Sequence, residues 1–256
     1  MNVIPILIII LFVLMLLVGG SRGIRTFFTL FFNFIIFFFM LFFIALSFDP
    51  ILITIIASIA ITYITLFFLN GVNQKTKSSF ISVIIVVLIT MLITYTMSRN
   101  AKIQGFSTEE LDSIATLSLY VNLNFSKIIL CQILIGLLGG IIDVSISVAS
   151  AMNEVFRNNP LIEKKDLLKS GLNIGKDILG IMTNTLLFAY MSGFISLMIY
   201  FNILKYSFGN MVNSKIFVSE IFQLLIGGIG IILIIPITAL ITTETLTKRD
   251  ALPQKE

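Results

Sequence analysis

Two polar stripes in an otherwise apolar chain contain most of the side chains that are suited to chemistry at membrane depth. Helical residues turn by ~100° each, so positions separated by four, seven and eleven residues share one face. Residues 143–154 and 173–184 both follow this rule. The first stripe carries Asp143, Ser147, Ser150 and Glu154, and the second carries Asn173, Asp177 and Asn184 with Thr183 beside them.

Asp143 is the strongest functional candidate in these stripes. A carboxylate at bilayer depth costs roughly 2.5–3.5 kcal/mol on insertion scales, so its presence needs a reason. The side chain is protonated, paired with an amide such as Asn184, or exposed to a watery cavity. We predict that Asp143 binds a proton or a cation, with Asn184, Thr183 and Ser147 as neutral ligands. The alternative is that Asp143 and Asn184 only tie two helices together, through a bond worth about 1 kcal/mol.

The depths of the two stripes allow them to share one site if they face each other. Asn184 lies eight residues beyond Lys176, or ~12 Å along a helix, and Asp143 lies ~16 Å from Glu154. Glu154 and Asp177 then form a vestibule at the shared loop, or they are simply solvated interfacial charges. Tyr190, Glu220 and Gln223 are weaker candidates. We interpret Tyr190 as a helix contact or an interfacial anchor. Glu220 and Gln223 are interpreted as solvated interface groups, with the lining of an external mouth as the alternative.

Glycines extend both stripes and indicate helix packing. Gly136, Gly139 and Gly140 continue the first stripe, and Gly180 belongs to the second. Small residues at this spacing allow another helix backbone to approach closely within a membrane. We therefore expect these four glycines to lie in helix–helix contacts.

The composition is that of a membrane protein. Hydrophobic residues make up 57% of the 256 residues, charged residues only 12%, and the mean hydropathy is +1.07. A soluble domain of this length needs many more charges on its surface. The single cysteine, Cys131, excludes an intrachain disulfide, and the lack of histidine disfavours haem or zinc chemistry. We expect no metal site, no cofactor and no nucleic-acid partner, since the basic residues lie between apolar runs.

Apolar runs of membrane length predict an all-α, polytopic bundle of about seven transmembrane helices. Residues 98–126 are expected to form an extracytoplasmic loop with a short helix, which begins at the capping box Ser107–Glu110. Residues 150–171 are expected to form a cytoplasmic loop. The first run could be a cleaved signal peptide, but its positive residues, Arg22 and Arg25, follow it, which favours a retained helix. The expected spans are residues 3–19, 27–47, 51–69, 80–97, 127–149, 172–204 and 216–243.

The distribution of positive charge predicts an external N-terminus and a cytoplasmic C-terminus. With seven spans, twelve Lys and Arg residues fall in inner segments and five in outer ones, as the positive-inside rule requires. The inner set is Arg22, Arg25, Lys75, Lys77, Arg157, Lys164, Lys165, Lys169, Lys176, Lys248, Arg249 and Lys255. The outer set is Arg99, Lys102, Lys127, Lys205 and Lys215.

Two long motifs resemble the signature of the YibE/F family of bacterial membrane proteins. The motifs are Gly139-Gly-Ile-Ile-Asp-Val-Ser-Ile-Ser-Val-Ala-Ser-Ala-Met-Asn-Glu154 and Ser170-Gly-Leu-Asn-Ile-Gly-Lys-Asp-Ile-Leu-Gly-Ile-Met-Thr-Asn-Thr-Leu-Leu-Phe-Ala-Tyr190, and Gly105-Phe-Ser-Thr-Glu-Glu110 is also similar. The short N-terminus resembles YibF-like members. The resemblance implies a multispanning protein of the bacterial cytoplasmic membrane that often occurs beside a longer, YibE-like paralogue. It implies no established activity and points to Asp143, Ser147, Ser150, Asn153, Glu154, Asn173, Asp177 and Asn184.

Three functions are compatible with these observations. The leading hypothesis is a small permease or transporter subunit with a cation- or proton-linked polar site between the fifth and sixth helices. The alternative is a non-transporting scaffold subunit that pairs with a YibE-like paralogue or with a second copy of itself. An intramembrane enzyme that modifies lipid is the weakest hypothesis, because no nucleophile is recognisable. We expect no enzymatic activity.

Overall fold

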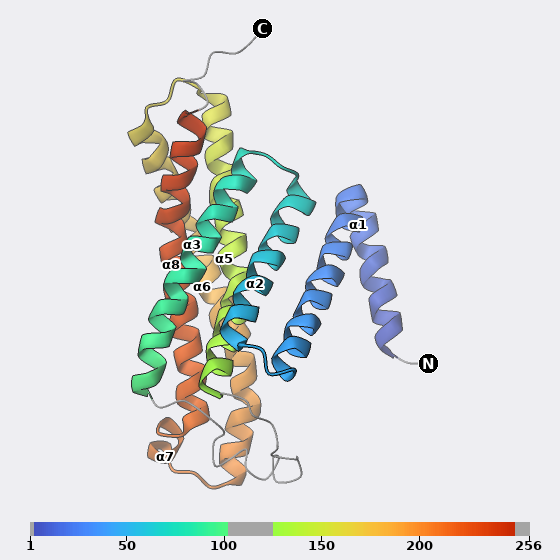
Figure 1. Cartoon of the computed structure of the whole chain (residues 1–256), viewed down its shortest axis with the longest axis vertical. Helices are drawn as coiled ribbons and strands as arrows, with labels where there is room; N and C mark the ends of the chain where they lie inside the picture. Colours follow the sequence, from blue (N-terminus) through green and yellow to red (C-terminus); the bar gives the residue numbers. More distant parts are fainter. Residues whose placement is uncertain (1–2, 102–124, 249–256) are drawn as a thin grey trace.

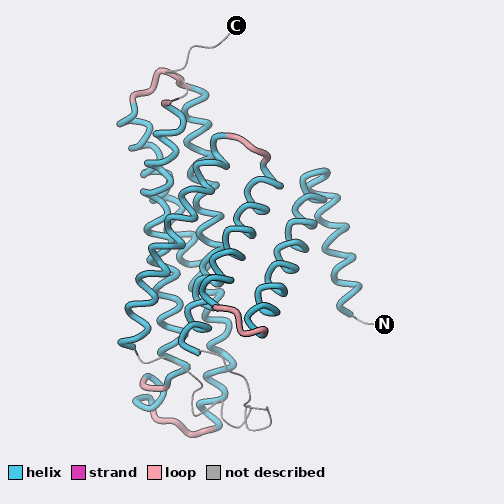
Figure 2. The backbone as a smooth tube through the Cα atoms, viewed as in Figure 1, coloured by secondary structure: helices cyan, strands magenta, loops and turns pink. Residues whose placement is uncertain are grey.

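The computed structural model describes residues 3–101 and 125–248, and every regular element within these ranges is a helix (Figures 1 and 2). Six stretches of this described part of the chain are long and apolar enough to cross a membrane. The expected all-helical membrane bundle is therefore confirmed. The elements are α1 (Val3–Ala45), α2 (Pro50–Tyr63), the π-helix η1 (Ile64–Phe68), α3 (Gln74–Ala101), α5 (Phe125–Asn158), α6 (Lys164–Ile203), α7 (Phe208–Val212) and α8 (Lys215–Thr247).

The core of the bundle lies between α3, α5 and α8, with α6 packed against α5 and α8. Buried aliphatic side chains from these helices, such as Val86, Ile141 and Ile234, fill the space between them. Outside this core, α2 joins α5 through a smaller cluster that includes Ala57 and Met40 of α1. Figure 1 shows α1 at the edge of the molecule, beside α2. Most of its phenylalanines are exposed, as expected for a helix that contacts lipid.

A hinge in α1 accounts for the difference between seven expected spans and six long helices. At Gly20 the backbone adopts φ +54° and ψ −132°, a conformation that favours glycine. The chain bends back there, and Figure 1 shows two arms side by side. A Cβ at Gly23 would overlap the backbone of Met15, so glycine is also required where the arms approach. The two expected spans, 3–19 and 27–47, thus correspond to the two arms of α1.

The helices α5 and α6 extend beyond the expected membrane spans, and the loop between them is correspondingly short. The sequence predicted spans over 127–149 and 172–204, with the fifth helix continuing past Glu154 toward Pro160. The α5 helix does continue to Asn158, whereas α6 begins at Lys164, earlier than expected. Hydropathy locates only the apolar part of a helix, and polar turns extend beyond it. The α5 helix ends just before Pro160, since the residue preceding proline avoids helical geometry. The short helix predicted at Ser107 lies outside the described residues.

One end of the bundle contains most of the positive charge. We call it the α5–α6 end, because it contains the α5–α6 loop (residues 159–163). The α1 hinge, the α2–α3 loop and the end of α8 lie at this same end (Figure 1). The described basic residues of the predicted inner set belong to these segments or to the adjoining helix turns, except Lys176, which lies twelve residues into α6. The other end carries Lys127, Lys205 and Lys215.

Asp49 fixes the corner between α1 and α2. Its carboxylate accepts hydrogen bonds from the backbone N–H groups of Ile51 (3.0 Å) and Leu52 (3.5 Å), and Pro50 occupies the first helical position. The Lys127 ammonium at the start of α5 donates a further hydrogen bond to this carboxylate. The corner is therefore anchored to the central helix.

We expect the Asp49→Asn variant to be slightly less stable than the wild type at neutral pH. The hydrogen bond from Lys127 holds the pKa of Asp49 below its ordinary value of 3.8. A folded-state pKa below the unfolded one means that the stabilisation is present at neutral pH and is lost as the pH falls through the lowered pKa. Asparagine keeps the helix cap but loses the ion pair. The pair is half-exposed, so we expect a loss of under about 1 kcal/mol.

Thermal unfolding of the purified protein, at neutral pH and at the lowest pH that the folded protein tolerates, measures this effect. The two proteins should differ at neutral pH and converge in acid. A difference that is equally large at both pH values would contradict the assignment to the carboxylate.

Candidate functional site

The polar stripe of α5 lies on the outward side of the helix. Asp143 is exposed, whereas Ser145, two residues later and ~200° around the helix, is completely buried in the core. Ser147 and Ser150 are half-buried, and Glu154 is exposed. The stripe therefore forms an open face of α5 within a single chain.

Asp143 occupies the middle of α5 without a polar partner. It follows Lys127 by sixteen residues, or ~24 Å, and precedes Glu154 by ~16 Å. Its neighbours Ile142 and Val144 are buried among apolar side chains. Among residues 3–101 and 125–248, no side chain forms a hydrogen bond or an ion pair with Asp143. An isolated carboxyl group thus lies on a surface that the bilayer would cover.

The polar stripe of α6 also points away from the bundle. Asn173, Asp177, Gly180, Thr183 and Asn184 are all exposed. Asn173 and Asp177 are each two residues, or ~200° around the helix, from Gly175, which lies beside Ile235 of α8. Asn184 is equally far around the helix from Leu186, which lies beside Gly140 of α5.

The two stripes consequently do not face each other in one chain, and Asn184 is not paired with Asp143. Gly171 and Gly175 determine the rotation of α6. A Cβ at Gly171 would overlap Met152, and a Cβ at Gly175 would overlap Ile235. Helix association in membranes favours such close contacts between small residues and apolar side chains, and it leaves the polar side of α6 outside.

The glycines that were expected to pack fall into two groups. Gly136 and Gly140 lie in contacts: an added Cβ would be 2.7 Å from Nε2 of Gln223 or 3.7 Å from Leu186, respectively. Gly139 and Gly180 have no atoms within 4 Å of an added Cβ position. Gly139 therefore leaves room for another helix on the open face of α5.

A polar cluster joins α5, α6 and α8 in the half of α5 that lies away from the α5–α6 end, with Gln132 exposed and Gln223 buried. Gln132 donates to the Gln223 side chain (3.4 Å), and Gln223 is only 8% exposed. The Tyr190 hydroxyl is buried near Gln223 and makes no hydrogen bond of good geometry to a described residue. Sequence reasoning treated Tyr190 and Gln223 as weaker candidates, but the structure brings them together. Gly136 provides the space for both side chains.

A second group of polar residues, which the sequence analysis missed, lies in the core between α3, α5 and α8. Ser145 is 3.0 Å from the Thr238 hydroxyl, and Thr242 donates to Ser78 at 3.1 Å. Hydroxyl residues recur at helical spacing on α3 and α8, and this pattern was the available signal. These neutral groups link the helices, and none of them carries a charge.

Charged side chains at the α5–α6 end form weak surface pairs. Lys164 and Lys248 approach Glu244 at 3.5 and 4.0 Å, and Arg157 approaches Glu154 at 3.9 Å. All are largely exposed, so each contributes little to stability. Across the described ranges, no three cysteine or acidic side chains are grouped to hold a metal ion. A cation bound at Asp143 would need neutral oxygen ligands to complete its coordination shell.

Comparison with known proteins identifies one family. The family model described as YibE/F-like protein matches residues 7–248, which include both stripes and the polar cluster around Gln223. Neither a curated protein nor a solved structure matches the chain. The comparison therefore supplies a family and assigns no activity to any residue.

Proposed function

The chain belongs to the YibE/F-like protein family, and on this premise we propose that it is a subunit of a small permease that moves a proton or a cation along the open face of α5. The observation that carries the proposal is the position of Asp143. Its carboxyl group is exposed near the middle of a membrane-length helix and has no polar partner in the described ranges. An ionisable group at this depth is unfavourable in lipid and is typical of ion or proton pathways.

The pathway is completed by a neighbouring chain that covers the α5 stripe. Within one chain the stripe would contact lipid, and a second polar surface removes that unfavourable contact. Gly139 supports this arrangement, because the space beside it admits another helix backbone. The neighbouring chain is a second copy or a longer, YibE-like paralogue. Asp143, Ser147 and Ser150 line the pathway, with Glu154 at its mouth.

The charge distribution supports an orientation for this pathway. The α5–α6 end is the more basic one, so it faces the cytoplasm of the bacterial cell under the positive-inside rule. Glu154 and Asp177 then lie toward the cytoplasmic surface. The acidic character of the stripe favours a proton, a metal cation or a neutral or cationic solute over an anion.

Cysteine accessibility in intact membranes tests whether water reaches the stripe. Starting from a Cys131→Ala background, we would compare Ser147→Cys and Ser150→Cys with Ile232→Cys, an exposed apolar position on α8. A small, water-soluble thiol reagent should label positions 147 and 150 rapidly and position 232 slowly. Equal protection of all three positions would contradict an aqueous pathway.

The second candidate function is a scaffold subunit, in which the stripe is a dry seam between chains. The open position at Gly139 on the same face supports it, because a small residue there suits helix pairing without any pathway. In this case the labelling at 147 and 150 is slow in the assembled protein. Cross-linking between copies, or with a co-expressed paralogue, through cysteines at the same positions remains efficient.

A further inference from the structure

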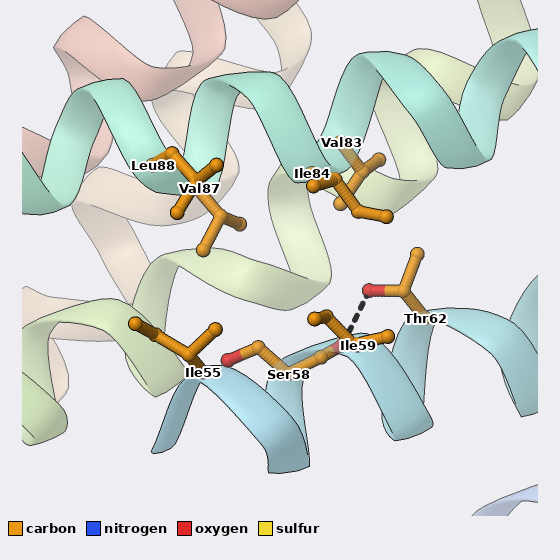
Figure 3. Close-up of a pocket in the computed structure, with 8 residues that line it drawn as sticks. All are labelled: Ile55, Ser58, Ile59, Thr62, Val83, Ile84, Val87 and Leu88. Carbon is orange, nitrogen blue, oxygen red and sulfur yellow. Dashed lines mark hydrogen bonds between the residues drawn. The ribbon is translucent and has the colours of Figure 1, made fainter. Parts of the chain in front are cut away.

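A pocket of about 150 Å³ lies between α2 and α3, and none of the residues of the proposed pathway lines it. Figure 3 shows its eight lining residues, six of which are aliphatic. Val83 and Val87 of α3 are buried at its base. Ile59 (39% exposed) and Leu88 (48% exposed) lie at its rim, so the pocket opens toward the surface that lipid contacts.

Ser58 is the polar exception in this lining. Its side chain is 2% exposed, and its hydroxyl has no hydrogen-bond partner among the described residues. Figure 3 shows Ser58 on the side of α2 that faces α3, between Ile55 and Ile59. The other hydroxyl of the pocket, on Thr62, already donates to the Ser58 carbonyl oxygen at 2.6 Å. The pocket therefore holds one unpaired donor in an apolar space.

Neither water nor a lipid tail satisfies this donor. A buried water molecule needs about two to four polar partners, and the hydroxyls of Ser58 and Thr62 are the only polar side-chain groups in the lining. An apolar space of this size accepts molecules such as benzene. Ser58 lies eight residues into α2, or ~12 Å from its first residue, which is close to the middle of a hydrocarbon core about 30 Å thick. Lipid ester groups remain near the bilayer surface, and an acyl chain has no acceptor at this depth. Leaving the buried hydroxyl unpaired is unfavourable.

We propose that the α2–α3 pocket binds a neutral, membrane-dissolved molecule with a ring-sized apolar body and a carbonyl oxygen that accepts the Ser58 hydrogen bond. The volume of the pocket limits the size of the ligand's buried part, and the aliphatic lining favours a ligand with an apolar surface. No charged side chain lines the pocket, so a charged ligand is excluded. The ligand enters from the lipid phase between Ile59 and Leu88.

Fluorine NMR on the purified protein in lipid nanodiscs tests the proposal with two matched probes. The first probe, para-fluoroacetophenone, carries a ring and a carbonyl group. The second, para-fluoro-α-methylstyrene, has the same shape with a methylene group in place of the oxygen. Saturable binding above that of empty nanodiscs is expected for both probes. The ketone should bind about fivefold more tightly, the contribution of a single neutral hydrogen bond.

Three variants assign this binding to the pocket and to its hydroxyl. Ser58→Ala should lower the affinity for the ketone to that of the hydrocarbon and leave the hydrocarbon unchanged. Ser82→Ala is the control, because it removes a buried serine of α3 that does not line the pocket. Val87→Phe should fill the pocket and abolish saturable binding of both probes. If this variant does not fold, Ile55→Phe fills the same space from α2.

Several results would overturn the proposal. Equal affinities of the two probes in the wild type would exclude a role for the Ser58 hydroxyl. Binding that persists in the filled variants would place the site elsewhere. A lack of saturable binding by either probe would show that the pocket is closed or is occupied by lipid tails alone.

Discussion

Replacement of Asp143 by asparagine is expected to reduce proton or cation flux at least about tenfold, while expression and folding remain normal. Asparagine has nearly the same size as aspartate but cannot ionise. A charged hydrogen-bonding group contributes about 1.5–3 kcal/mol to a polar site, which corresponds to a factor of about ten or more. Because Asp143 is exposed and has no polar partner within the described chain, the substitution removes no hydrogen bond or ion pair there.

Flux through the wild type and the variant is measured in liposomes that contain the protein, alone and with a co-purified paralogue. An internal pH-sensitive dye reports proton movement, and imposed gradients of Na⁺ or K⁺ test for cations. Glu163→Gln is the matched control, because Glu163 is an exposed carboxylate of the α5–α6 loop and lies outside the α5 stripe. It should stay within about twofold of the wild type, since exposed charges contribute little.

An Asp143→Asn variant with undiminished flux would contradict the permease proposal. Asp143→Glu separates charge from geometry, because it retains an ionisable group on a longer side chain. We expect this variant to recover part of the flux.

The Gly175→Ala variant is expected to lose about 1–3 kcal/mol of stability, the range typical of overpacked cores. A Cβ at this position would overlap the Ile235 side chain of α8. Ile235 is β-branched, so its rotamer cannot easily adjust. The α6 helix would have to move away from α8 to accommodate the methyl group. Gly171 is less sensitive, because its neighbour Met152 is flexible.

Gly180→Ala provides the matched control for this prediction. It makes the same change on the same helix, at a site where nothing lies within 4 Å of the added Cβ. Alanine favours helix over glycine by up to about 1 kcal/mol, so this variant should be as stable as the wild type or slightly more stable. Since the chain has no tryptophan, thermal unfolding is followed by size-exclusion chromatography of a fluorescent fusion in detergent. Equal melting of the two variants would contradict the close packing of α6 on α8.

The sequence alone determined the class of the protein and the positions of its membrane helices. Long apolar runs fold as helices in lipid, because a helix pairs every backbone polar group within the same segment. The sequence also predicted that most basic residues lie at one end of the bundle. Helical arithmetic identified the stripes of Asp143 and Asp177, since the rotation per residue is fixed.

Only the tertiary structure decided which face of each helix lies inside. In water, apolar residues indicate the buried face, but lipid is as apolar as leucine, so composition does not distinguish a core face from a lipid face. The contacts of Gly171 and Gly175 rotate α6 so that its polar stripe points outward, and the stripe of α5 is left open for a neighbouring chain. The pairing of Ser145 with Thr238 and the pocket beside Ser58 likewise depend on which helices become neighbours. That choice follows from the shapes of side chains far apart in the sequence, which no local pattern encodes.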